Sequence, residues 1–225
     1  MKSNIESHSI SVPIGRDSIY GDLNIPVGSR SVILFAHGSG SSRHSPRNKY
    51  VAEVLNQAGF STLLLDLLTA DEERIDQQTA HLRFDIELLA DRLISGTDWL
   101  GARPGLEMRH IGYLGASTGA AAALVAAANR PDVVEAVVSR GGRPDLAGSS
   151  LSAVCAPTLL IVGELDDVVI ELNRRAAAEL QAEHEIKIVP GATHLFEEHG
   201  ALEEVAALAR DWFEQHLLKR KTDVA

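Results

Sequence analysis

The pattern of hydrophobic and polar positions changes once along the chain, near residue 30. Residues 7–27 (SHSISVPIGRDSIYGDLNIPV) alternate apolar and polar side chains on both sides of the segment Gly15-Arg16-Asp17. Such alternation is typical of half-buried strands, and a glycine-containing turn between two of them predicts a β-hairpin.

Six continuous apolar runs follow the hairpin. They lie at 31–38, 61–68, 111–117, 135–142, 156–166 and 185–191. Runs of this kind are typical of strands that are buried on both faces of a parallel sheet. Helical patterns separate them, at 47–59, 71–102, 117–132, 169–183 and 199–220. Strands that alternate with helices predict βαβ units, and therefore an α/β fold with a mostly parallel, doubly wound sheet.

The chain of 225 residues contains no internal repeat and no break in composition. This length fits one compact domain. The connection at 143–155 is too short for a large inserted lid. We therefore expect a single lidless domain over residues 1–225, with a frayed tail at 219–225.

Composition and charge exclude several classes of partner. The net charge of −10 argues against nucleic acid or an anionic membrane. Cys155 is the only cysteine, which excludes an intramolecular disulfide and a cysteine-rich metal site and fits the reducing cytoplasm. No secretory signal, membrane-spanning run or metal-ligand spacing is present. We expect a cytoplasmic protein without a cofactor. The sequence leaves open whether the protein forms a homodimer.

Three chemically reactive side chains follow three of the expected strands. In an open α/β sheet, functional groups gather beyond the carboxyl ends of the strands. The run at 111–117 ends in GASTG, with Ser117 between two glycines; Asp166 and Asp167 end another, and His194 follows the last. A serine, a carboxylate and a histidine thus reach one sheet edge in this order. The structural alternatives are a capping turn, a helix-capping loop and a surface histidine.

GASTG and this chain order resemble the α/β-hydrolase superfamily, and more closely its small, lidless dienelactone-hydrolase-like serine hydrolases. GASTG matches the nucleophile elbow, a strained strand-to-helix turn that needs small residues at 115 and 119. The resemblance covers nearly the whole chain and implies a three-layer α/β/α sandwich around a mostly parallel eight-stranded sheet. Dienelactone hydrolases proper use a cysteine nucleophile, whereas this chain has Ser117. The resemblance therefore does not carry over the lactone substrate.

The resemblance also implies roles for the gathered side chains. Ser117 would be the nucleophile and His194 the general base. The family's orienting acid lies about three residues after a strand-ending glycine, which selects Asp166; Asp167 competes with it, and Glu164 is a third candidate. His37 is interpreted as a structural histidine of the oxyanion loop.

Backbone N–H groups would stabilise the developing oxyanion. The resemblance places these donors on Ser39 and Thr118. The predicted reaction is acyl transfer from a small ester or thioester to Ser117, followed by hydrolysis of the acyl-enzyme. The alternatives are a peptidase or acyltransferase with the same triad, or a non-catalytic binding protein on the same fold.

Arginines follow two of the expected strands: Arg43 and Arg47 after the first, Arg140 and Arg143 at the end of the fourth. Because a guanidinium pairs well with carboxylate or phosphate, these four residues predict an anionic group on the acyl substrate. The alternative is that they pair with acidic residues and hold loops in place. The acidic candidates are Asp66, Asp145 and the cluster at 71–73.

Overall fold

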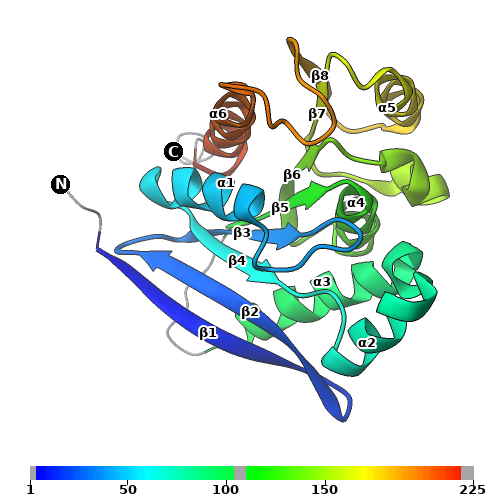
Figure 1. Cartoon of the computed structure of the whole chain (residues 1–225). Helices are drawn as coiled ribbons and strands as arrows, with labels where there is room; N and C mark the ends of the chain where they lie inside the picture. Colours follow the sequence, from blue (N-terminus) through cyan, green and yellow to red (C-terminus); the bar gives the residue numbers. More distant parts are fainter. Residues whose placement is uncertain (1–3, 104–109, 219–225) are drawn as a thin grey trace.

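A computed structural model describes residues 4–103 and 110–218, so the predicted tail at 219–225 lies outside the described residues. The strands are β1 (Ile5–Ile14), β2 (Asp17–Pro26), β3 (Ser31–Ala36), β4 (Ser61–Leu65), β5 (His110–Ala116), β6 (Val134–Arg140), β7 (Thr158–Gly163) and β8 (His184–Val189). They form one eight-stranded sheet in the order β1-β2-β4-β3-β5-β6-β7-β8 (Figure 1). The pairs β1–β2 and β2–β4 are antiparallel, and all other neighbouring strands are parallel. The predicted mostly parallel sheet with an N-terminal hairpin is therefore confirmed.

The hairpin forms where the alternating pattern predicts it. Ile14 pairs with Asp17, so Gly15 and Arg16 make a two-residue loop, with Gly15 at φ +60°. The apolar positions Val12 and Ile19 are buried, whereas their polar neighbours mostly stay exposed. Only one face of the hairpin therefore packs on the hydrophobic core, and the other face meets solvent.

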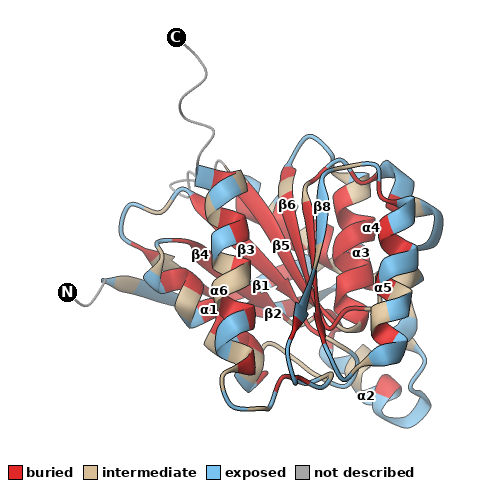
Figure 2. Ribbon diagram, turned by 90° about the horizontal axis from the view of Figure 1, so that it is seen from above, coloured by how far each residue is buried: buried red, intermediate tan, exposed pale blue. Residues whose placement is uncertain are grey.

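Helices cover both faces of the sheet (Figure 2). In residues 4–103 and 110–218 the six α-helices are α1 (Pro46–Gln57), α2 (Ala70–Thr79), α3 (Ile86–Gly101), α4 (Thr118–Asn129), α5 (Asp167–Glu179) and α6 (Ala201–Phe213). Helices α1 and α6 pack on one face, and α3, α4 and α5 pack on the other, each group with its own cluster of buried side chains. β3 and β7 are buried along their whole length, as continuous apolar runs predict for strands covered on both faces.

The helical segment expected at 71–102 is interrupted. Helix α2 ends at Thr79, and its C-cap residue Ala80 adopts the left-handed conformation at φ +53°. A 3₁₀ turn, η1 (Leu82–Phe84), follows, and the side chain of Asp85 then caps α3 by accepting a hydrogen bond from the amide of Leu88. The sequence does not reveal this break, because residues 77–85 contain no glycine or proline to mark the end of a helix.

The 143–155 connection contains structure that the sequence did not indicate. Two 3₁₀ turns, η2 (Pro144–Ala153), meet at Gly148, which has φ +53°. Ala147 and Leu151 from this segment are buried against the core. Within the described ranges, no helix is long and apolar enough to cross a membrane.

Candidate active site

Ser117 stands at a strained turn between β5 and α4. Its φ is +50° and its ψ is −122°, a backbone conformation that side-chain-bearing residues rarely adopt. Ser117 takes the N-cap position of α4, yet among the described residues its side chain makes no capping hydrogen bond. The serine is half-buried and its hydroxyl does not cap the helix, so the capping-turn alternative does not describe this turn, whose strained strand-to-helix backbone is similar to that expected of a nucleophile elbow.

The glycines beside Ser117 allow two backbone segments to touch. A Cβ at position 115 would overlap the first turn of α4 and lie 2.5 Å from the carbonyl oxygen of Gly119. A Cβ at 119 would overlap the end of β3 and lie 2.5 Å from the carbonyl oxygen of His37. Backbone atoms cannot move aside as flexible side chains can, so both positions require glycine.

His194 and Asp166 are in contact. The Nδ1 atom of His194 lies 2.7 Å from Oδ2 of Asp166, which comes from the loop between β7 and α5. The other acidic candidates lie elsewhere: Asp167 is exposed in the first turn of α5, and Glu164 accepts a hydrogen bond from the amide of Gly191 at 2.7 Å. The carboxylate at 166 therefore holds the imidazole, and the one at 164 holds the loop that leads to it.

Ser117 and His194 line the same cavity, whose volume is about 270 Å³. Gly141, at the end of β6, brings the histidine loop close to this cavity. Its φ is +51°, and a Cβ there would lie 3.0 Å from the carbonyl oxygen of His194. Sequence reasoning missed this role, although the Gly-Gly pair at 141–142 after an apolar run was a signal for a sharp turn.

The expected oxyanion donors lie on both sides of Ser117. Ser39 lines the cavity together with Gly38, at which a Cβ would lie 3.0 Å from Cβ of Ser117. Thr118 is the first residue of α4, and the first N–H groups of a helix have no partner within the helix. Ser39 therefore shares the cavity with Ser117, and Thr118 follows Ser117 directly in the chain.

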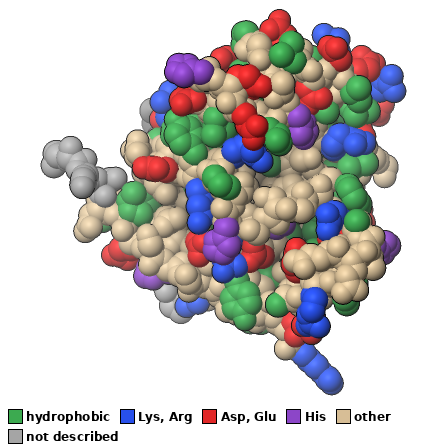
Figure 3. Space-filling model, viewed as in Figure 1, with side chains coloured by type: hydrophobic (Ala, Val, Ile, Leu, Met, Phe, Trp, Pro, Cys, Tyr) green, Lys and Arg blue, Asp and Glu red, His purple; other side chains and the backbone are tan. Residues whose placement is uncertain are grey.

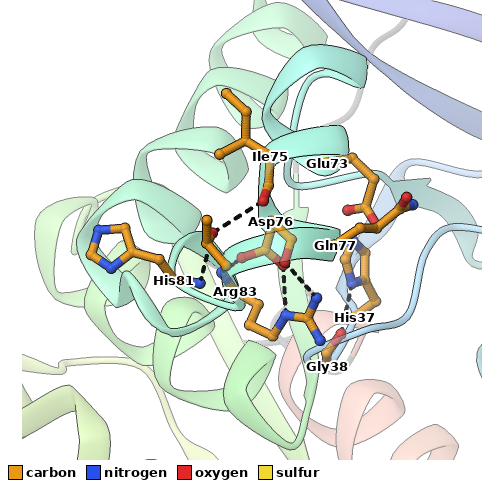
Figure 4. A network of polar contacts seen from close by, with 9 residues as sticks. His37, Gly38, Glu73, Ile75, Asp76, Gln77, His81 and Arg83 are labelled. Atoms are coloured by element: carbon orange, nitrogen blue, oxygen red, sulfur yellow. Dashed lines mark hydrogen bonds and ion pairs between the residues drawn. The ribbon is translucent and has the colours of Figure 1, made fainter.

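His37 is built into the start of the 37–41 loop (Figure 4). Its Nδ1 lies 2.9 Å from the carbonyl oxygen of Gly38, and its Nε2 accepts a hydrogen bond from the amide of Leu67 at 3.1 Å. These two bonds require a neutral ring that carries its proton on Nδ1. Burial lowers the pKa of His37, and the hydrogen bond to Gly38 opposes this only in part. The expected structural role thus has a specific set of contacts.

A buried ion pair lies behind the same loop (Figure 4). Asp76 is 1% exposed and accepts hydrogen bonds from the backbone amide of Arg83 at 3.0 Å and from its Nε at 2.6 Å. Burial alone would raise the pKa of Asp76, but the hydrogen bonds and charge of Arg83 lower it below its usual value. A Cβ at Gly40 would lie 3.5 Å from Nη1 of Arg83, so the pair supports the 37–41 loop from behind. Sequence reasoning missed this pair.

The four arginines divide into two groups. Arg43 forms an ion pair with Asp66, and Arg143 binds Asp145 through two hydrogen bonds of 2.8 Å; neither arginine lines the cavity. The loop-holding alternative therefore describes this group. Arg47 and Arg140 do line the cavity, beside Ser117 and His194.

The part of the chain that the structure describes contains no group of three or more His, Cys, Asp or Glu side chains that could hold a metal ion.

Comparison with known proteins identifies the family of this chain. The model of the dienelactone hydrolase family matches residues 21–218. The chain belongs to the dienelactone hydrolase family. A solved dienelactone hydrolase from Anabaena variabilis is 58% identical to this family member, with a TM-score of 0.92 over 94% of this chain and 98% of that chain.

Other relatives extend the comparison. Est1E from Butyrivibrio proteoclasticus shares the fold at 16% identity, with a TM-score of 0.78 over 94% of this chain and 99% of that one. Curated proteins from two strains of Mycobacterium tuberculosis are 58% identical over 213 residues and carry phosphoribosyl transferase in their names. The match covers 95% of this family member but 47% of theirs, so the chain spans about half of their length.

The close packing at Gly119 predicts that an added methyl group destabilises the protein there more than at an uncrowded glycine. We expect Gly119→Ala to lower the free energy of unfolding by about 1–3 kcal/mol, because the new Cβ must displace backbone atoms of β3. Gly101→Ala at the end of α3 is the control: no atom lies within 4 Å of the added Cβ. Urea unfolding of both variants measures the difference, and equal stabilities would contradict the close-approach account.

The buried neutral state of His37 predicts a loss of stability in acid. The unfolded chain protonates this histidine near pH 6.5, whereas the folded protein does so only at lower pH. Below about pH 6.5 the unfolded state therefore binds more protons than the folded state. The free energy of unfolding decreases as the pH is lowered through this range. We expect a shallower fall in His37→Asn, measured by urea unfolding between pH 8 and pH 5. The exposed His81→Asn variant should keep the wild-type slope, and a wild-type slope in His37→Asn would count against this role.

Proposed function

We propose that this protein is a serine hydrolase that cleaves a small ester or thioester through an acyl-enzyme on Ser117. The 2.7 Å contact between His194 Nδ1 and Asp166 Oδ2, beside a cavity that Ser117 and His194 both line, carries this proposal. The contact assigns the Nδ1 proton to the side facing the carboxylate. Nε2 is then the atom that accepts a proton during catalysis.

The proposed reaction has two stages. In the first, His194 takes the proton of the Ser117 hydroxyl while Oγ attacks the substrate carbonyl carbon, and the amides of Ser39 and Thr118 bind the oxyanion. The intermediate collapses as the leaving group receives that proton from the imidazolium. In the second stage, His194 activates a water molecule, which attacks the acyl carbon and releases the carboxylic acid and Ser117. Asp166 stabilises the imidazolium in both stages without taking its proton.

The size of the cavity favours a small substrate. Its volume of about 270 Å³ lies near the lower end of ligand-binding pockets, which start at about 300 Å³. The η2 segment between β6 and β7 is ten residues long and packs on the core, so it supplies no large cover for a peptide chain. These features favour an esterase or thioesterase over a peptidase.

The names of the mycobacterial relatives point to another reaction, phosphoribosyl transfer. This chain corresponds to about half of those proteins. Its candidate site pairs a seryl hydroxyl with an imidazole and a carboxylate, a set of groups suited to acyl transfer. We propose that the reaction of this site is acyl transfer, and that the phosphoribosyl transfer in those names is not performed here.

A fluorophosphonate probe tests the nucleophile directly. We expect the probe to add to the peptide that contains Ser117 and to no peptide of Ser117→Ala, as read by intact mass and peptide mapping. Ser152→Ala is the control, because Ser152 is an exposed serine of η2. An adduct that persists in Ser117→Ala would overturn the assignment.

The adjacent carboxylates at 166 and 167 offer a matched pair of substitutions. Asp166→Asn should lower kcat for a p-nitrophenyl ester by about ten-thousand-fold, because the amide favours the wrong tautomer of His194. Asp167→Asn should leave kcat within about two-fold, since the 167 side chain is exposed and such surface changes have small effects. The opposite ranking would move the orienting role to residue 167.

A further inference from the structure

Arg140 carries a buried charge that no carboxylate in the described ranges neutralises. The residue is 7% exposed, and its Nη2 donates a hydrogen bond of 2.8 Å to the side-chain carbonyl of Asn48. Among the described residues, no acidic side chain lies within ion-pair distance of its guanidinium, and its buried Nε has no partner. A buried charge is costly unless an opposite charge compensates it. The site is therefore electrostatically incomplete.

The cavity around Arg140 has no negative charge of its own. Its lining includes Arg47 and Arg140 and no aspartate or glutamate. Burial first, and the nearby charge of Arg47 second, lower the pKa of Arg140 to about 10, so the residue stays charged at neutral pH. On the face shown in Figure 3, by contrast, basic and acidic side chains are interspersed. The positive cavity is a local arrangement in a protein whose net charge is −10.

Other donors of the cavity add to the two arginines. Ser45 caps α1, so the N-terminal end of this helix, where the dipole is positive, lies at the cavity wall. The first turn of α1 contains no acidic residue to offset it. Ser39 and Ser41 also line the cavity. The wall beside Ser117 thus presents cations and hydrogen-bond donors together.

Arg47 differs from Arg140 because it has a replaceable partner. Its Nη1 lies 2.9 Å from Oε1 of Glu197, on the loop that carries His194. The side chain of Glu197 is 64% exposed, and an exposed ion pair of this kind adds little to stability. An anion that enters the cavity can therefore take the place of Glu197 at little cost.

We propose that Arg140 and Arg47 form a subsite for an anionic group on the non-reacting part of the substrate, with Asn48 as the positioning residue. The inference rests on the proposed hydrolysis at Ser117 and narrows its substrate class. Asn48 holds the guanidinium of Arg140 through a neutral amide, which orients the cation and leaves its charge for the ligand. Carboxylate and phosphate share the oxygen chemistry that a guanidinium recognises.

The test compares matched aryl acetates: 3-carboxyphenyl acetate, 3-phosphonooxyphenyl acetate and the neutral 3-carbamoylphenyl acetate. A second set carries the same groups on the acyl part. We expect kcat/KM of the wild type to be at least ten-fold higher for an anionic member than for its neutral counterpart in one of the two sets. The better of carboxylate and phosphate identifies the natural group.

Asn48→Asp is the sharpest variant, because it changes one atom and supplies Arg140 with an internal counter-ion. The anionic-to-neutral ratio of kcat/KM should fall toward one in Asn48→Asp and in Arg140→Met. Arg143→Gln, outside the cavity, should keep the wild-type ratio. A wild-type ratio near one in both sets overturns the subsite, as does a ratio that Asn48→Asp and Arg140→Met leave unchanged.

Binding without turnover separates this inference from the proposed reaction. Calorimetric titration with inorganic phosphate and with acetate should show binding of at least one anion to the wild type and at least ten-fold weaker binding to Asn48→Asp. Absence of fluorophosphonate labelling at Ser117 together with such binding would refute the hydrolase proposal alone. Labelling of Ser117 without anion binding and without charge preference would refute the subsite alone.

Discussion

The backbone contact between the first turn of α4 and the end of β3 is the constraint on which the candidate site depends. Gly119 allows the helix to approach the carbonyl oxygens of Ala36 and His37. The same approach forces the strained backbone at Ser117 and brings Gly38 against the serine Cβ. One close contact thus sets the position of the serine relative to the 37–41 loop. The cost of the strained turn is covered by the buried core that α4 forms with the sheet.

The remaining parts of the site are held by polar contacts rather than by core packing. His37 binds the 37–41 loop to the segment after β4, and the Asp76–Arg83 pair lies behind that loop. Glu164 binds the loop that leads to His194. These contacts keep short, irregular segments in place around a cavity that has no large lid in the described residues. Rigid support of this kind keeps donor groups aligned before a substrate enters.

The sequence predicted the elements whose physical signal is local. Periodicity located the hairpin and the buried strands. Ser117, Asp166 and His194 each follow one of those strands, so the shared edge of a parallel sheet predicted that they lie near one another. The arginines could not be sorted in this way, because Arg140 and its partner Asn48 are 92 residues apart. The break before α3 was hidden for a similar reason: Ala80 adopts a left-handed conformation that no residue type there demands. Local patterns predict elements, whereas pairing between distant polar side chains depends on the assembled fold.

The most direct test of the account is the chemical identity of the reaction intermediate. During the burst phase with an aryl acetate, rapid acid quenching and peptide mapping should find one acetyl group on the peptide that contains Ser117. Acetate release without acetyl-Ser117, or an acetyl group on Cys155 instead, would contradict the proposed nucleophile.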